Sequence, residues 1–161
     1  MAKKFFYSED QIALGLLIVR IGIGIAFMAH GFPKLFMGGA LGLSKGLAAA
    51  GIPGGVAAAY LAAFAEFFGG MALIAGLFFR PTTVALAFTM LVALVFHLKL
   101  GDSFIKYSHP LESGILFVAL TVAGPGRFSV DYKLFGTSAE KERTCEEGRR
   151  PVMHVPAQQT A

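Results

Sequence analysis

The sequence predicts an all-α integral membrane protein, a bundle of four transmembrane helices followed by a short polar tail. Composition is the first reason: 55% of the 161 residues are hydrophobic, 15% are charged, and the mean hydropathy is +0.65. A soluble domain usually carries about 25% charged residues, and a disordered chain has few apolar residues and many charged ones. The length fits a single domain. The second reason is arrangement, because the apolar residues gather in four runs separated by glycine and proline.

These four runs approach or exceed the length needed to cross a bilayer. We expect spans at about residues 12–32, 56–79, 81–100 and 108–124, within a membrane domain of residues 1–136. A hydrocarbon core of about 30 Å needs roughly 20 residues at about 1.5 Å per residue. The first two runs meet this length, whereas the last two reach it only with flanking residues.

Glycine and proline mark the connections between the spans. Residues 51–55 precede the second span, Pro81 begins the third, and residues 124–126 end the fourth. Between the first two spans, residues 41–50 predict a short interfacial helix with Lys45 facing water.

The distribution of basic residues predicts the orientation. Residues 137–161 are expected to form a mobile polar tail, because charged residues are frequent there and large apolar residues are rare. Four spans place both termini on one side of the membrane. That side collects most of the cations: Lys3, Lys4, Arg80, Arg127, Lys133 and those of the tail. Cytoplasmic segments are enriched in Lys and Arg, so we expect both termini to be cytoplasmic.

Two opposite charges fall near the middle of predicted spans. Arg20 lies in the first span and Glu66 in the second, and antiparallel spans bring them to similar depth. A charge at that depth costs several kcal/mol unless it is paired or hydrated. We therefore expect an Arg20–Glu66 ion pair. It either fixes the helix register alone or lines a polar pocket for a head group, a proton or a small ligand.

A second polar layer is predicted near the non-cytoplasmic ends of the spans. Its members are His30, Lys34, His97, Lys99, His109 and Glu112. His30 and Lys34 share a helical face if the first helix continues through Pro33. Such a layer can hold a quinone carbonyl by hydrogen bonds and relay protons, or bind a transition metal. An ordinary polar belt at the helix ends explains the same residues, and no metal site is assigned.

Most cofactor and catalytic signatures are absent from the sequence. The single cysteine, Cys145, excludes an internal disulfide, a CxxC pair and a cysteine-based zinc site. There is no HExxH, Walker loop or dinucleotide-binding GxGxxG motif. The isoelectric point of about 9.4 does not predict nucleic-acid binding, because the cations flank apolar helices instead of forming one patch. No catalytic residue is assigned.

Three motifs carry a resemblance to a known family. They are Arg20-x-Gly22 with Phe27-x-x-His30-Gly31-x-x-Lys34-Leu35, Glu66-x-x-Gly69-Gly70 with Leu77-x-x-Arg80, and Gly124-Pro125-Gly126-Arg127-x-Ser129-x-Asp131. Together they resemble the DoxX family of membrane proteins over roughly residues 12–135. The resemblance implies a four-helix protein of the bacterial or archaeal inner membrane. Arg80 and Asp131 match motif positions, and we regard them with Lys34 as supporting residues.

The resemblance also implies a class of function. Relatives include a subunit of a thiosulfate:quinone oxidoreductase, proteins linked to quinone stress and a membrane partner of redox-defence enzymes. We therefore predict a subunit or auxiliary of a quinone-linked oxidoreductase or redox-defence complex, with an intramembrane pocket formed by Arg20, His30, Glu66, His97 and Glu112. Without a cysteine pair, flavin motif or haem motif, the chain needs a soluble or membrane redox partner. The alternative is a non-catalytic scaffold or a small-molecule binder or transporter, and homo-oligomer formation stays open.

Overall fold

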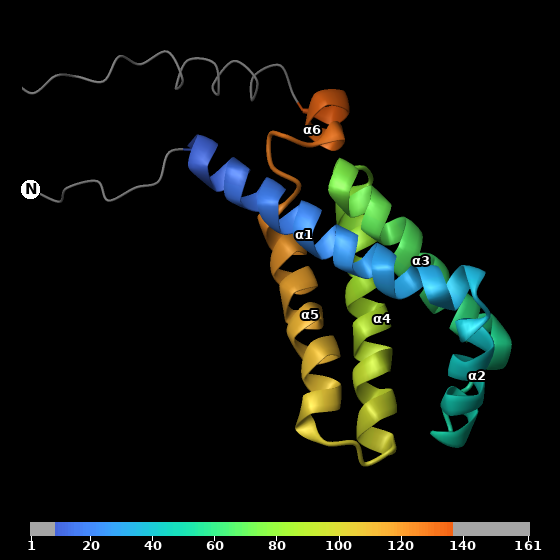
Figure 1. Cartoon of the computed structure of the whole chain (residues 1–161). Helices are drawn as coiled ribbons and strands as arrows, with labels where there is room; N and C mark the ends of the chain where they lie inside the picture. The colour runs from blue at the N-terminus through green and yellow to red at the C-terminus, as the bar shows by residue number, and fades with distance from the viewer. Residues whose placement is uncertain (1–8, 137–161) are drawn as a thin grey trace, which may run out of the picture.

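A computed structural model describes residues 9–136, and this part of the chain is all-helical, as predicted. The helices are α1 (Glu9–Phe36), α2 (Gly39–Ala49), α3 (Gly55–Ala75), α4 (Phe79–Lys99), α5 (Phe104–Ala123) and α6 (Val130–Phe135) (Figure 1). The polar tail expected at 137–161 lies outside the described residues.

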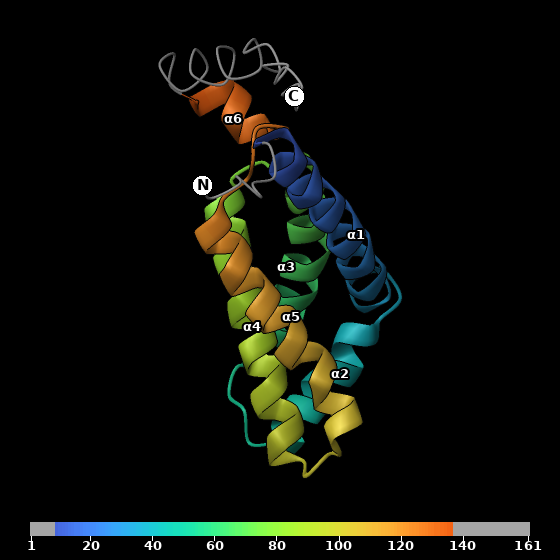
Figure 2. The same cartoon turned by 90° about the vertical axis from the view of Figure 1, so that its left-hand side faces the viewer.

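Two antiparallel helix pairs form the body of the molecule. Helix α1 packs along α3, α4 packs along α5, and a contact between α3 and α4 joins the pairs (Figures 1 and 2). The short helix α2 packs against α3 near one end, and α6 lies at the opposite end. Helices α1, α3 and α4 are long and apolar enough to cross a membrane by length and composition. The 20-residue α5 is more polar in its first half, where Lys106, His109 and Glu112 lie.

Three helix ends differ by four residues from the expected spans. Helix α5 begins at Phe104 instead of residue 108, so Pro110 lies inside it. Helix α1 continues through Pro33 to Phe36, because proline removes only its own N–H donor from the helical ladder. Helix α3 ends at Ala75, since Gly76 takes the left-handed conformation (φ 67°) that terminates helices. The last two differences place Lys34 within α1 and Gly76 outside α3.

Backbone contact between α1 and α3 depends on glycine. A Cβ atom added to Gly31 would lie 2.6 Å from the backbone nitrogen of Phe67, and one added to Gly70 would lie 2.7 Å from the carbonyl oxygen of Gly24. Small residues let helices approach this closely in a bilayer, where close packing rather than water expulsion drives association. The contacts fix α1 and α3 in one register.

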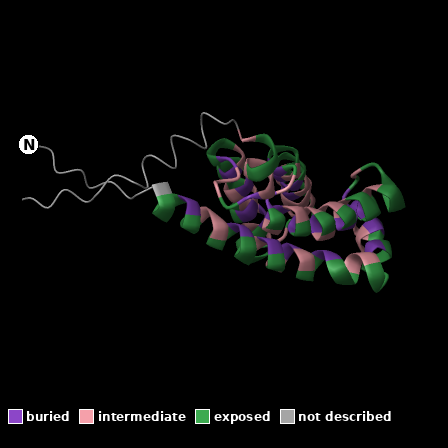
Figure 3. Cartoon of the chain, turned by 90° about the horizontal axis from the view of Figure 1, so that it is seen from above, coloured by how far each residue is buried: buried purple, intermediate pink, exposed green. Residues whose placement is uncertain are grey.

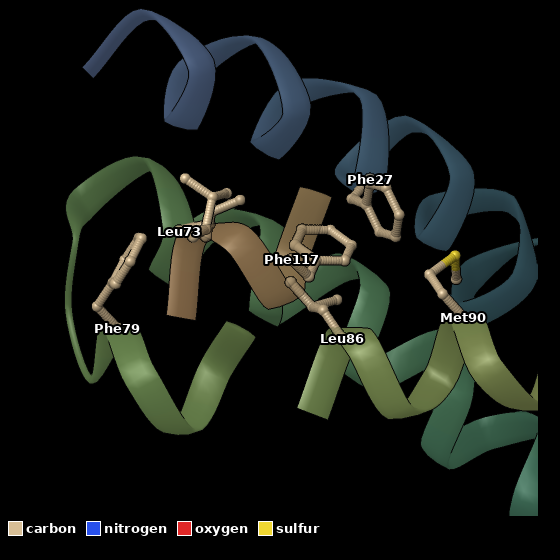
Figure 4. Packing of buried hydrophobic residues seen from close by; sticks show 7 residues of the cluster. Phe27, Leu73, Phe79, Leu86, Met90 and Phe117 are labelled. Carbon is tan, nitrogen blue, oxygen red and sulfur yellow. The ribbon is translucent and has the colours of Figure 1, made fainter. Parts of the chain in front are cut away.

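A buried apolar cluster fills the space between the helix pairs (Figure 4). Its members are Phe27, Leu73, Phe79, Leu86, Met90, Phe117 and Leu120. Phe27 of α1 meets Phe117 of α5 edge to face, with ring centroids 4.8 Å apart. Exposed large apolar side chains include those of Ile18, Leu61, Phe88 and Val122. Figure 3 shows exposed residues along the outer sides of the helices. Such a surface suits a lipid environment.

The turn between α3 and α4 is held by a residue from far along the chain. The Asp131 carboxylate accepts hydrogen bonds from the backbone N–H groups of Phe78 (2.9 Å) and Phe79 (2.7 Å). The Asp131 N–H donates to the carbonyl of Gly76 (3.0 Å). The carboxylate thereby caps the N-terminus of α4, where negative charge is favourable. Phe78 itself has a positive φ of 45°, so this turn needs such support.

Replacement of Gly31 by alanine should weaken the fold. The new methyl group would press on the Phe67 backbone, so α1 and α3 must separate, at a cost of about 1–3 kcal/mol in the free energy of unfolding. Gly22→Ala is the matched control, because nothing lies within 4 Å of its added Cβ and alanine favours helix by up to about 1 kcal/mol. The thermal unfolding midpoint in detergent should be highest for Gly22→Ala, intermediate for the wild type and lowest for Gly31→Ala. Equal midpoints would contradict the close contact between α1 and α3.

Replacement of Asp131 by alanine should also lower stability. Two N–H groups at the start of α4 would lose their acceptor, and a lost helix cap costs about 1–2 kcal/mol. Asp131→Asn should fall between, because one side-chain oxygen remains. Glu112→Gln removes an exposed carboxylate instead and should leave the unfolding midpoint unchanged. An Asp131→Ala midpoint equal to that of Glu112→Gln would refute the capping role.

Candidate functional site

Arg20 is buried against backbone carbonyls. Its side chain is 1% exposed, and its guanidinium donates to the carbonyls of Leu73 (3.0 Å), Ile74 (2.9 Å) and Pro125 (2.6 Å). The last carbonyls of a helix lack intrahelical partners, and positive charge is favourable at a helix C-terminus. Arg20 therefore caps α3 and joins it to the loop after α5. Its carbon Cζ also lies 5.7 Å from the ring centroid of Phe79.

The expected Arg20–Glu66 ion pair is wrong. Glu66 instead accepts two hydrogen bonds from Lys34 Nζ, at 2.7 and 2.6 Å. The register explains the difference: because Gly31 lies against Phe67, the residues opposite Glu66 are at the end of α1. Arg20 lies 14 residues before Lys34 on α1, a separation of about 21 Å along the helix. Alignment of the predicted midpoints gave the wrong register because α1 extends beyond α3. Arg20 already lies at the C-terminal end of α3, whereas α1 begins at Glu9.

Lys34 and Glu66 belong to a cluster built from three helices. We call it the Lys34 cluster: Lys34 and His30 from α1, Glu66 from α3, and His109 and Glu112 from α5. The ring centroids of His30 and His109 are 5.0 Å apart. The charges of Glu66, Lys34 and Glu112 all act on the His109 ring. The predicted common face of His30 and Lys34 is thus present, because α1 continues through Pro33.

The Lys34 cluster combines one buried group with exposed ones. The Glu66 side chain is 5% exposed and the Lys34 side chain 31%, while His30, His109 and Glu112 are exposed. Phe27 lies behind the imidazoles, stacked on the His109 ring at 6.2 Å between centroids. Hydrogen-bonding groups at the surface therefore adjoin a buried ion pair. A neutral imidazole can donate one hydrogen bond, accept another and exchange protons near neutral pH.

His97 is not part of this cluster. Its Nδ1 atom lies 2.8 Å from Oδ2 of Asp102, whose other oxygen accepts from Lys106 Nζ at 2.6 Å. The hydrogen bonds from His97 and Lys106 lower the pKa of Asp102. The carboxylate therefore stabilises the α4–α5 turn above its unfolded pKa, and this contribution is lost as the pH falls through the lowered value. Asp102 was not among the predicted residues, although its spacing from His97 and Lys106 across a glycine turn was a usable signal.

The remaining predicted residues have other surroundings. Arg80 is exposed in the first turn of α4, and Asp131 caps that helix. Within residues 9–136, no three His, Cys, Asp or Glu side chains are grouped so that they could hold a metal ion. The pocket predicted from Arg20, His30, Glu66, His97 and Glu112 thus divides into separate places, and the Lys34 cluster is the part with accessible chemistry.

Residues 9–136 are all-helical, contain three candidate spans and have an apolar outer surface, as in a multi-pass membrane protein. The profile of the DoxX family matches residues 15–98, and the chain belongs to this family. It is 32% identical over 121 residues to the inner membrane protein YqjF of Escherichia coli, covering 73% of this chain and 90% of that protein. It is 30% identical over 124 residues to the inner membrane protein YphA of the same organism, covering 72% and 87%. No solved structure matches the chain significantly.

Two double-mutant cycles test whether Glu66 is paired with Lys34 or with Arg20. Lys34→Met and Glu66→Met each leave the other partner unpaired, so together they should cost less than the sum of the single variants, with a coupling of about 0.5–3 kcal/mol. Arg20→Gln and Glu66→Met should be additive within about 0.5 kcal/mol, because the two sites share no partner. Free energies of unfolding in mixed detergent micelles measure both cycles. Strong coupling between Arg20 and Glu66 would contradict the register described above.

Proposed function

We propose that this protein is a membrane auxiliary of a quinone-linked oxidoreductase or redox-defence complex and that a quinone head group binds at the Lys34 cluster. The observation that carries the proposal is a Lys34–Glu66 ion pair within the helical body, beside the touching rings of His30 and His109. Ionisable groups in membrane-spanning segments are costly, and they commonly mark ligand sites and proton relays.

The donor set of the Lys34 cluster fits a quinone. Quinone carbonyls accept hydrogen bonds, which an imidazole N–H of His30 or His109 can donate. Phe27 offers an apolar ring surface directly behind His109. The buried Glu66 carboxylate, paired with Lys34, places a negative charge near the His109 ring. His30 or Glu112 would exchange protons with the surrounding solution, since both are exposed.

A bound quinone would supply the redox chemistry, and this chain would supply binding, orientation and protons. The chain has one cysteine and no flavin or haem motif, so electrons would come from a redox partner. Its membrane would be the inner membrane, the location in the names of both E. coli relatives. In this arrangement α5 is the fourth span and both termini are cytoplasmic. The excess of basic residues on the side of the two termini favours this orientation.

The apolar core favours binding over transport. Between the Lys34 cluster and Arg20 lie buried apolar side chains, among them Phe27 and Leu73. A transport path would need polar groups that continue across the bilayer, whereas these two polar places are separated. A non-catalytic scaffold is therefore the outcome to expect if no quinone binds.

Quinone titration followed by thermal shift tests the proposal. A short-chain ubiquinone should raise the unfolding midpoint of the detergent-solubilised wild type. His30→Gln should weaken binding about tenfold, the equivalent of one hydrogen bond of about 1.4 kcal/mol, and Glu66→Gln should weaken it similarly by removing the buried charge. His97→Gln is the matched control, because His97 belongs to the α4–α5 turn, and it should bind like the wild type. No shift in the wild type, or equal affinities for His30→Gln and His97→Gln, would overturn the proposal.

A further inference from the structure

Helix α6 is held in one orientation at the end of the molecule. Besides the bonds from Asp131 to the α3–α4 turn, the Ser129 hydroxyl is buried, donates to the carbonyl of Gly126 (2.6 Å) and accepts from the N–H of Tyr132 (3.1 Å). Ser129 thus caps the N-terminus of α6, and Asp131, the second residue of the helix, bonds α6 to the α3–α4 turn. Figures 1 and 2 show α6 beyond the ends of α3 and α4.

The side of α6 that bonds to the α3–α4 turn also carries two exposed apolar side chains. Leu134 and Phe135 lie three and four residues after Asp131, and this spacing places all three on one side of a helix. Asp131 meets the α3–α4 turn, but Leu134 is 63% exposed and Phe135 is 68% exposed. The two apolar side chains therefore face the same way as the capping carboxylate, outside the edge of the helical body.

Further apolar and basic residues adjoin this face. Phe78, whose N–H binds Asp131, is 62% exposed. Arg80 is exposed in the first turn of α4, and Lys133 is exposed on α6. Exposed Phe and Leu side chains next to Lys and Arg are typical of helices that lie in the interface of an anionic bilayer, with apolar side chains below the head groups and cations among the phosphates.

We propose that the α6 patch, formed by Phe78, Leu134 and Phe135 with Arg80 and Lys133, inserts into the interfacial region of a bilayer containing anionic phospholipid. Charge complementarity favours lipid as the occupant, because two cations border three exposed apolar side chains. The bonds of Asp131 fix the angle at which α6 enters the interface. This contact is independent of any ligand at the Lys34 cluster.

A single tryptophan can report on this contact, because the natural chain contains none. Phe135→Trp in the full chain, reconstituted in vesicles of phosphatidylcholine and phosphatidylglycerol, should emit at shorter wavelength than a water-exposed indole. Phospholipid brominated near the head group should quench it several-fold more than phospholipid brominated near the chain end. Lys45→Trp is the matched control: Lys45 is exposed on α2, at the opposite end of the molecule and outside the patch, and a side chain expected to face water should be quenched several-fold less.

Two results would overturn the proposal. Water-like emission from Phe135→Trp without quenching would show that the patch faces solution and is open to a soluble protein. Equal quenching of Phe135→Trp and Lys45→Trp would show that the α6 patch contacts the bilayer no more than a side chain outside it does. The position of the patch also predicts weaker quenching of Phe135→Trp in vesicles of phosphatidylcholine alone, since the cations then lose their anionic partners; unchanged quenching would refute the preference for anionic lipid.

Discussion

The contact between the backbones of α1 and α3 determines where every buried charge finds its partner. Gly24 against Gly70 and Gly31 against Phe67 leave no room for another register, because side chains there would overlap backbone atoms. That register brings Arg20 to the C-terminus of α3 and Lys34 to Glu66. Since an unpaired charge within a bilayer is costly, packing of small residues and pairing of charges must agree, and here both select the same arrangement.

The two ends of the molecule treat their charged side chains differently. At one end Arg20 and Asp131 bond to backbone groups at helix termini, where intrahelical hydrogen-bond partners are missing. At the other end Lys34 and Glu66 bond to each other, and their neighbours His30 and His109 are exposed. Among the residues that the structure describes, no buried side-chain nitrogen or oxygen lacks a partner. Only the second arrangement leaves hydrogen-bonding groups accessible to a ligand.

Composition and breaker residues were enough to predict helices α1 to α5, but not α6 or the register between α1 and α3. The spans could be located because apolar runs dominate the sequence, and even α2 was marked by the glycines around it. The partners of Arg20 could not be found from spacing, because a guanidinium bonds equally well to carbonyls, which every residue carries. Lys34 was regarded only as a supporting residue, since Pro33 left the end of α1 open. His97 was grouped with His30 by depth, although a local carboxylate, Asp102, was five residues away.

The positions of Arg20 and Asp131 change what the family resemblance can be used for. Both residues belong to the motifs that carry the resemblance, and both bond to the backbone around the α3–α4 turn. The hydrogen-bonding groups of both side chains are used by helix ends, so the motifs that contain them have a structural role in joining α1, α3, α4 and α6. Membership of the DoxX family therefore supports the architecture directly, whereas a functional argument must come from groups that the fold leaves accessible. Lys34, Glu66 and the two imidazoles beside them are such groups, and they owe their proximity to the extra helical turn that α1 makes through Pro33.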